Sequence, residues 1–255
     1  MESTTIYKIY DKIIENFLRL PMITPEVLNM PIYIPDERIP EVTLRPDGDK
    51  ITSINRPEYR VIADFQGTKG EAYTECPCGF EGTLKEALDI RPTDNGISAA
   101  TIASINAAMS HFGHFKGIFP DDPAVHQKYA KKLCIYVSRN FGRSNIVLVG
   151  YDGYIVKTFV ESGIDFWTMD RNPENISRDL FHHIVVNSGK WNRESAFAWG
   201  KVFLITGSTL CNGTITQYLG RGIEQGRQIL FYGITAAGPM KLLGLPWFAT
   251  DCIEH

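Results

Sequence analysis

The stretch KVFLITGSTLCNGTI, residues 201–215, joins a short apolar run to a loop of small polar residues. Residues 202–205 are Val-Phe-Leu-Ile, a pattern typical of a strand buried on both faces of a parallel sheet. The loop after this strand begins at the edge where parallel sheets usually bind ligands. Residues 212–214 predict a helix start whose N–H groups could face a polar ligand, but Asn212 as a plain helix cap is equally compatible.

The composition indicates a soluble globular protein of one large or two modest domains. The chain has 255 residues, of which 44% are hydrophobic and 22% charged. Its formal net charge is −3, so it lacks the basic field that dominates affinity for nucleic acids. We therefore expect no nucleic-acid partner.

Apolar runs and cysteines bear on where the protein is located and on the state of its thiols. No apolar run approaches the ~18 residues of a membrane helix, and the first residues alternate in charge, so we expect a cytoplasmic protein with no membrane partner. Five cysteines, an odd number, do not indicate a disulfide framework in a chain large enough to build a core. Free thiols or metal ligands fit better.

The first half predicts a smaller α+β unit. Apolar residues at helical spacing predict an amphipathic helix over residues 6–18, and the prolines between residues 21 and 46 exclude a long helix there while allowing an extended piece at 30–34. Residues 59–65 and 71–74 flank a Gln-Gly turn and predict a β-hairpin.

Two thiols follow the hairpin in the sequence Cys76-Pro-Cys78. Such a pair can share a soft metal ion, but structural zinc normally takes four ligands and no second pair exists. A reduced turn is the alternative. Thr83 and Glu86 then form a capping-box pattern that predicts a short helix through residue 88.

An alanine-rich segment, residues 98–110, predicts a tightly packed helix. Asn106 lies on it, and His111 and His114 follow three residues apart at its end. Paired imidazoles suit metal binding or acid–base chemistry, although a structural or surface role is the alternative.

The second half predicts a Rossmann-like, mainly parallel sheet. Asp122-Pro123 is a helix start, and we place a domain boundary there, with domains at 1–121 and 122–255. Strands are predicted at 146–149, 166–169, 182–186, 228–232 and 247–249, with a helix between the first two and an excursion or short helix at 191–199. The loop at 233–239 repeats the small residues of the loop at 206–214, so both belong to one sheet edge.

Ordinary dinucleotide binding is disfavoured at the first of these strands. Asp170 lies twenty residues after Gly150, where such folds place an acidic residue on a ribose. The loop itself, however, reads G-Y-D-G-Y and not G-x-G-x-x-G, and Asp152 stands where a phosphate would need backbone N–H groups.

Three segments together resemble a prokaryotic family of unknown function labelled putative heavy-metal chelation. They are ITGSTLCNGTI, FYGITAAGPMKLLGLPWFA and GTKGEAYTECPCGFEGTLKEAL, and Thr206–Thr214 is the most specific. The resemblance covers roughly residues 5–250. It implies a Rossmann-like C-terminal domain, an N-terminal domain like that of enolase, and one cleft between them. The Cys76–Cys78 pair and the segment with His182, His183 and Trp191 depart from the family pattern, and enolase chemistry is not implied because no eight-fold barrel is present.

Two functions remain open from the sequence, beside the third alternative of a non-catalytic scaffold or oligomerisation module. The first is a small-ligand or metal-binding protein with its site in the interdomain cleft, for which a divalent transition metal is the candidate cofactor. The second is an enzyme acting on a small phosphorylated or nucleotide-like metabolite, with Asp152 or His114 as acid–base candidates. The ligand-binding candidates are Asn106, Asp170, Thr206, Gly207, Ser208, Thr209, Asn212, Gly213 and Thr214, and the metal candidates are Cys76, Cys78, His111, His114 and Cys211. A homodimer is expected only because symmetric oligomers are common.

Overall fold

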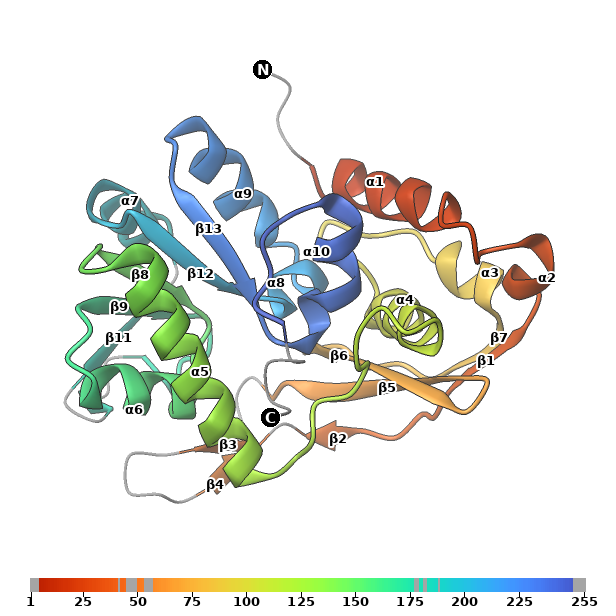
Figure 1. Ribbon diagram of the computed structural model, residues 1–255, viewed down its shortest axis with the longest axis horizontal. Helices are drawn as coiled ribbons and strands as arrows, with labels where there is room; N and C mark the ends of the chain where they lie inside the picture. The colour runs from red at the N-terminus through yellow and green to blue at the C-terminus, as the bar shows by residue number, and fades with distance from the viewer. Residues whose placement is uncertain are drawn as a thin grey trace.

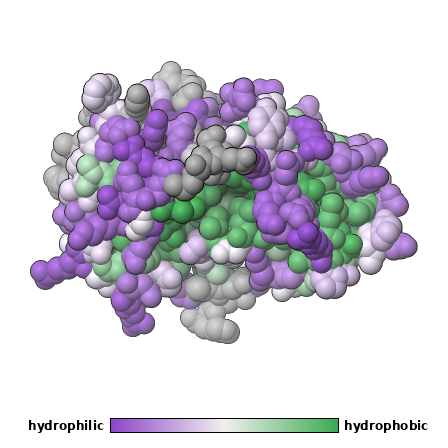
Figure 2. Space-filling model, turned by 90° about the horizontal axis from the view of Figure 1, so that it is seen from above, coloured by the Kyte–Doolittle hydropathy of each residue, from purple (hydrophilic) through white to green (hydrophobic). Residues whose placement is uncertain are grey.

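The computed structural model describes residues 5–40, 42–44, 50–52, 57–176, 179–180, 183–187 and 189–249. It contains an antiparallel sheet and a parallel sheet, each with helices packed on it (Figure 1). The predicted mixed α/β fold class is confirmed. Among these residues no helix is long and apolar enough to cross a membrane. Seen from above, hydrophilic side chains cover much of the surface, with apolar residues gathered in the middle of that face (Figure 2).

The antiparallel sheet is built around the predicted hairpin. Strands β5 (Tyr59–Phe65) and β6 (Thr68–Thr74) pair over their whole length. The other edge of β5 pairs with β2 (Ile39–Pro40) and with β1 (Pro31–Ile34), which in turn pairs with β7 (Phe80–Thr83). A separate small ribbon consists of β3 (Val42–Leu44) and β4 (Lys50–Thr52).

Four helices accompany this sheet. They are α1 (Ile6–Leu18), α2 (Pro25–Leu28), α3 (Leu84–Leu88) and α4 (Ala99–His111). The predicted capping box of α3 is present, since Thr83 Oγ1 accepts from Glu86 N and Glu86 accepts from Thr83 N. Helix α4 lies directly on β5 and β6, and its small residues allow this close approach. The three helices predicted for this half, at residues 6–18, through residue 88 and at 98–110, and the hairpin are therefore confirmed.

The second sheet has five parallel strands in the doubly wound order. In space they run β11 (His183–Asn187), β9 (Phe166–Asp170), β8 (Ile146–Val149), β12 (Val202–Thr206) and β13 (Gln228–Tyr232). Numbered along the chain this order is 3-2-1-4-5, which places the topological switch point between β8 and β12. The short β10 (Asp179–Leu180) adds an antiparallel edge.

Helices cover both faces of the parallel sheet. On one face α5 (Pro123–Phe141) and α6 (Gly153–Glu161) enclose one core, and on the other lie α7 (Lys190–Trp199) and α9 (Ile215–Glu224). This arrangement explains why residues 202–205 are all apolar: both faces of β12 are buried. Residues 191–199, for which the sequence allows either an excursion or a short helix, belong to helix α7.

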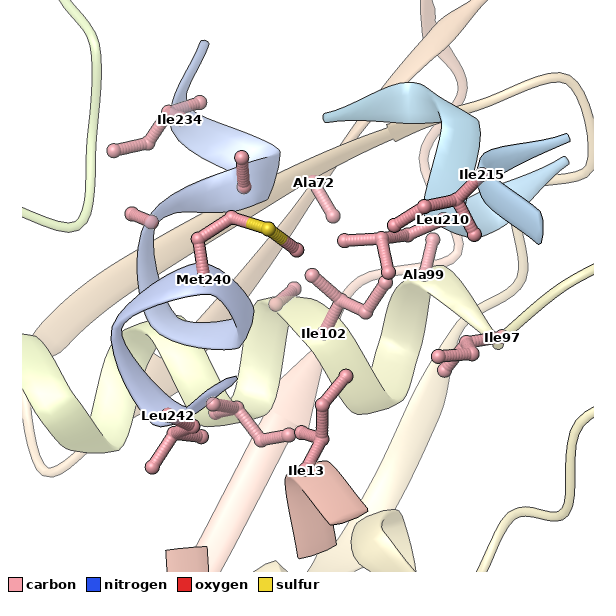
Figure 3. Close-up of a cluster of buried hydrophobic side chains, with 14 of the residues drawn as sticks. Ile13, Ala72, Ile97, Ala99, Ile102, Leu210, Ile215, Ile234, Met240 and Leu242 are labelled. Atoms are coloured by element: carbon pink, nitrogen blue, oxygen red, sulfur yellow. The ribbon is translucent and has the colours of Figure 1, made fainter. Parts of the chain in front are cut away.

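The core between the parallel sheet and helices α7 and α9 continues into the antiparallel sheet. After β13 the chain forms a 3-10 turn, η1 (Ile234–Ala236), and α10 (Ala237–Leu243), which packs on α4 and α1. Figure 3 shows Met240 and Leu242 of α10 in one apolar cluster with Ile102 of α4, Ile13 of α1 and Leu210 of α8 (Ser208–Cys211). The two sheets therefore share one continuous apolar core.

Three local predictions need correction. Asn212 does not start a helix: it ends α8, and α9 begins with Thr214 as its N-cap, because Gly213 at φ +72° lets the chain turn between them. Residues 233–239 are not an open loop but η1 and the first turn of α10. Residues 247–249 form no strand within the described chain, only a single bridge between Trp247 and Phe231. His182 lies outside the described residues.

Candidate functional site

A cavity of about 160 Å³ opens at the carboxyl edge of the parallel sheet. It lies beside the switch point, where the ends of β8, β9, β12 and β13 come together. A volume of this size holds roughly ten water molecules, so it suits a small organic molecule better than a bare ion. The cavity is thus positioned as ligand sites usually are in sheets of this kind.

The loop after β8 is closed by two carboxylates. Asp152 caps α6, since its Oδ1 accepts from Ile155 N at 2.9 Å. Asp170 at the end of β9 holds the loop itself, accepting from Tyr151 N at 2.7 Å and from Asn172 N at 2.6 Å. Burial raises the pKa of both carboxyl groups, against the lowering effect of these backbone N–H donors. Both side chains line the cavity.

Hydroxyl and amide groups of the loop after β12 line the opposite side. Thr206 Oγ1 lies 3.4 Å from Ser208 Oγ, and Thr209 Oγ1 donates to the carbonyl of Thr206 at 2.7 Å. Asn212 Oδ1 accepts from Thr214 N at 3.1 Å and from Thr214 Oγ1 at 2.6 Å. These five side chains all border the cavity. The strongest sequence signal therefore does lie at the cavity.

Gly150 allows the two loops to approach each other. Its φ is +94°, and a Cβ there would lie 2.6 Å from Thr206 Cγ2. Tyr232 closes the gap from β13, donating to the carbonyl of Gly150 at 2.9 Å. A side chain at position 150 would push the β8 and β12 loops apart and reshape the cavity.

The remaining wall comes from the antiparallel sheet and from α5. Tyr73 and Glu75 follow β6, and the backbone N–H of Tyr73 donates to Thr235 Oγ1 at 3.0 Å, which joins the two sheets. Glu75 pairs with Arg171 at 3.6 Å. The ring of His126, from the first turn of α5, stacks on Tyr154 with a centroid distance of 5.2 Å. The site is therefore built from both halves of the chain.

Charge in the cavity is unbalanced. Four carboxyl groups border it, those of Glu58, Glu75, Asp152 and Asp170, while the basic groups there within the described chain are Arg171 and His126. Arg171 is already paired with Glu75 through its Nη1 atom, which is buried and makes no hydrogen bond among the described residues. The surroundings favour a cationic ligand over an anionic one.

The end of α4 does not form a wall of this cavity. Asn106 is fully buried, where its amide donates to the carbonyls of Glu71 and Ile234 and accepts from Gly238 N. His111 contacts Thr68 Oγ1 near the surface, and burial together with the charge of Lys241 lowers the pKa of His114. Asn106 thus ties α4 to β6 and α10, and the structure brings neither histidine to the cavity.

The cysteine candidates fall in different places. Cys211 of α8 does not border the cavity, and burial raises the pKa of its thiol well above the usual range. Cys76 and Cys78 are exposed free thiols. Among the described residues no group of three or more His, Cys, Asp or Glu side chains is arranged to hold a metal ion.

Several lining residues carry no signal in the sequence. Glu58, Tyr73, Glu75 and His126 reach the cavity because the antiparallel sheet and α5 fold against the parallel sheet. Of these four residues, His126 is the one that lies in the first turn of a helix whose start the sequence predicts, at Asp122-Pro123. Long-range packing of this kind leaves no local pattern.

The expected family resemblance is confirmed. Residues 135–242 match the model of the family DUF364, whose description is "putative heavy-metal chelation". The match covers the parallel sheet from the end of α5 to α10, including the cavity loops after β8, β9, β12 and β13. No curated protein matched the sequence.

Two solved structures of this heavy-metal chelation family resemble the chain. One, from Pyrococcus horikoshii, is a protein of unknown function with 13% identity and a TM-score of 0.51, over 92% of this chain and 82% of that one. The other, from Desulfitobacterium hafniense, has 15% identity and a TM-score of 0.49, over 94% and 83%. At such identities the first of these likenesses shows the fold and nothing about the ligand.

Proposed function

We propose that the chain binds a small polar ligand of net positive charge in the cavity at the carboxyl edge of the parallel sheet. One observation carries this proposal: four carboxyl groups border the cavity, and one of the two basic side chains there is paired with one of them. A positive ligand gains from this field, whereas a negative one meets repulsion at a partly buried site.

A metal ion held in a small chelating molecule is the ligand that agrees best with the family description. The cavity is larger than a bare ion needs, and the described residues offer no ready set of three side-chain ligands. A chelate would bring its own donor atoms, while hydroxyl groups of Thr206, Ser208 and Thr214 could hydrogen-bond to its periphery.

A phosphorylated or nucleotide-like ligand is the second candidate. Asp170 stands at the end of the second strand of a 3-2-1-4-5 sheet, where dinucleotide-binding folds hold a ribose. However, both of its oxygens accept hydrogen bonds from the protein, and Asp152 already occupies the N-terminus of α6. A phosphate at α6 would have to displace or face that carboxylate.

Thermal-shift measurements on protein purified without an affinity tag separate the two candidates. Metal content is measured first, and then zinc, nickel, copper and cobalt salts are added, alone and with small chelators, beside a panel of nucleotides, S-adenosylmethionine and inorganic phosphate. We expect stabilisation by cationic ligands or metal chelates. Stabilisation by nucleotides or phosphate without metal would instead favour the second candidate.

A charge variant tests the electrostatic basis. Replacing Glu58→Gln removes one of the four carboxylates, and the affinity for the cationic ligand should fall by about tenfold, the equivalent of 1.4 kcal/mol. The matched control Glu161→Gln changes the same charge at the end of α6, outside the cavity lining, and should leave affinity unchanged. Equal effects of both changes would contradict a site in this cavity.

A further inference from the structure

Two exposed thiols stand two residues apart between β6 and β7. Cys76 and Cys78 are both free and exposed, whereas Cys134 is buried and Cys211 is half-buried. Thiolates are the protein ligands that soft metal ions prefer. Of the described cysteines, this pair is the one that offers two sulfur atoms to a solute without any opening of the fold.

The segment that carries the thiols is fixed at both ends. The backbone N–H of Cys76 donates to Thr74 Oγ1 at 3.1 Å, directly after β6. At the other end the backbone of Gly79 packs against Asp36, because a Cβ on Gly79 would lie 2.8 Å from Asp36 Cβ. Pro77 fixes its own φ between the two cysteines. Two residues of chain hold the Cα atoms within ~7 Å of each other, so little freedom is lost when both sulfurs bind one ion.

We propose that Cys76 and Cys78 form a two-thiolate binding site for a soft monovalent cation of the Cu(I) or Ag(I) class. Zinc normally takes four protein ligands, and the described residues gather no third His, Cys, Asp or Glu around this pair. Two sulfurs alone suit an ion that accepts low coordination. On binding, two S–H bonds release their protons to solvent and two metal–sulfur bonds form, with no transfer of electrons, so affinity rises with pH.

This site is separate from the proposed cavity. Glu75 borders the cavity, but the next residue, Cys76, and Cys78 do not. The family match begins at residue 135 and so does not include this pair. Failure of one site therefore leaves the other untouched, and a cation held at the thiols would sit one residue from the cavity wall.

Competition with a chromophoric Cu(I) chelator tests the site. The full chain is titrated without oxygen and with a non-thiol reductant, and it carries Cys252→Ser to remove the one cysteine that lies outside the described residues. We expect one Cu(I) per chain. Cys76→Ser and Cys78→Ser should each weaken binding by about 100-fold, because the second sulfur then no longer acts at high effective concentration. Cys134→Ala is the matched control and should bind as tightly as the parent.

Three results would overturn the assignment: undiminished Cu(I) affinity in either serine variant, an equal loss in the Cys134→Ala control, or binding of Zn(II) as tight as that of Cu(I). Far-ultraviolet circular dichroism and thermal unfolding confirm that the serine variants are folded, which their exposed positions favour. The thermal shifts with cavity ligands, measured on the same variants, should stay those of the parent.

Discussion

Glu71 is a buried carboxyl group whose ion pair does not fully offset its burial. Its side chain is 0% exposed and accepts hydrogen bonds from Arg60 and from the backbone N–H of Phe119. Burial raises the pKa of Glu71 to about 7, and the charge of Arg60 opposes this rise. Desolvation thus outweighs the attraction between the two side chains, as is common for buried ion pairs.

The raised pKa predicts a definite pH dependence. The folded protein binds the Glu71 proton more tightly than the unfolded chain, so this contribution to stability is complete below pH 4.5 and is lost as the pH rises to about 7. Relative to Glu71→Gln, the unfolding free energy of the parent should therefore fall by about 3 kcal/mol across this window. Urea denaturation of both proteins at pH 4.5, 6 and 8 measures it; a difference that grows in favour of the parent would show that the ion pair dominates.

Asn106 illustrates how residue type and role can be separated. The sequence predicts its position on the alanine-rich helix, but its amide hydrogen-bonds to three backbone groups in the interior and does not line the cavity. A polar residue in an apolar helix predicts that some buried group needs a partner. Which group it is depends on β6 and α10, segments that lie 35 and 132 residues away in sequence.

At the scale of elements, the spacing of apolar residues predicts helices and strands correctly where an element buries one face or both faces. The helix predicted at residues 6–18 is α1, and the strand predicted at 202–205 is β12. The hairpin predicted around the Gln-Gly turn is the β5–β6 pair. The sequence does not predict elements whose shape depends on long-range contacts: Gly233, Gly238 and Pro239 predict a loop where the structure has η1 and α10. In α10 Gly238 instead permits close packing on α4, since a Cβ there would lie 2.6 Å from Asn106 Oδ1 and 3.2 Å from Met109 Sδ.

The contact between β6 and α4 is equally close and yields a prediction. A Cβ on Gly70 would lie 2.0 Å from Ala107 N and 2.6 Å from the carbonyl oxygen of Ala103, so Gly70→Ala must separate strand and helix. We expect a loss of at least about 2 kcal/mol of unfolding free energy.

A second glycine provides the matched control for this change. A Cβ on Gly222 in α9 would meet only the side chain of Ile229, nearest at its flexible end, and alanine favours the helix, so Gly222→Ala should be close to neutral. Equilibrium denaturation compares the two. A mild effect of Gly70→Ala would mean that α4 is packed less tightly on the sheet than described.

At the scale of the whole molecule, two sheets share one core. We keep the division at residues 121 and 122 as a proposal for where two structural units meet, because it falls directly before α5. The apolar cluster nevertheless runs from Phe65 and Ile102 of one unit to Phe203 and Met240 of the other. Two units joined in this way should lose their structure together.

Cooperative unfolding can be followed separately in each unit. The four tryptophans, at positions 167, 191, 199 and 247, report on the second unit, and hydrogen exchange of β5 and β6 amides reports on the first. Both signals should give one denaturant midpoint, and Met240→Ala should lower both midpoints together by the equivalent of about 2–5 kcal/mol. Earlier opening of β5 and β6 would show two independently stable units.

The position of α10 also bears on how the protein is made. Residues 5–121 supply α1, the antiparallel sheet and α4, yet the apolar faces of α1 and α4 are covered by residues 237–243 of α10. During synthesis this surface leaves the ribosome more than a hundred residues before its cover does. The N-terminal half of the nascent chain therefore exposes this apolar surface until α10 has been synthesised. A chaperone that binds apolar surfaces would bind the nascent chain there.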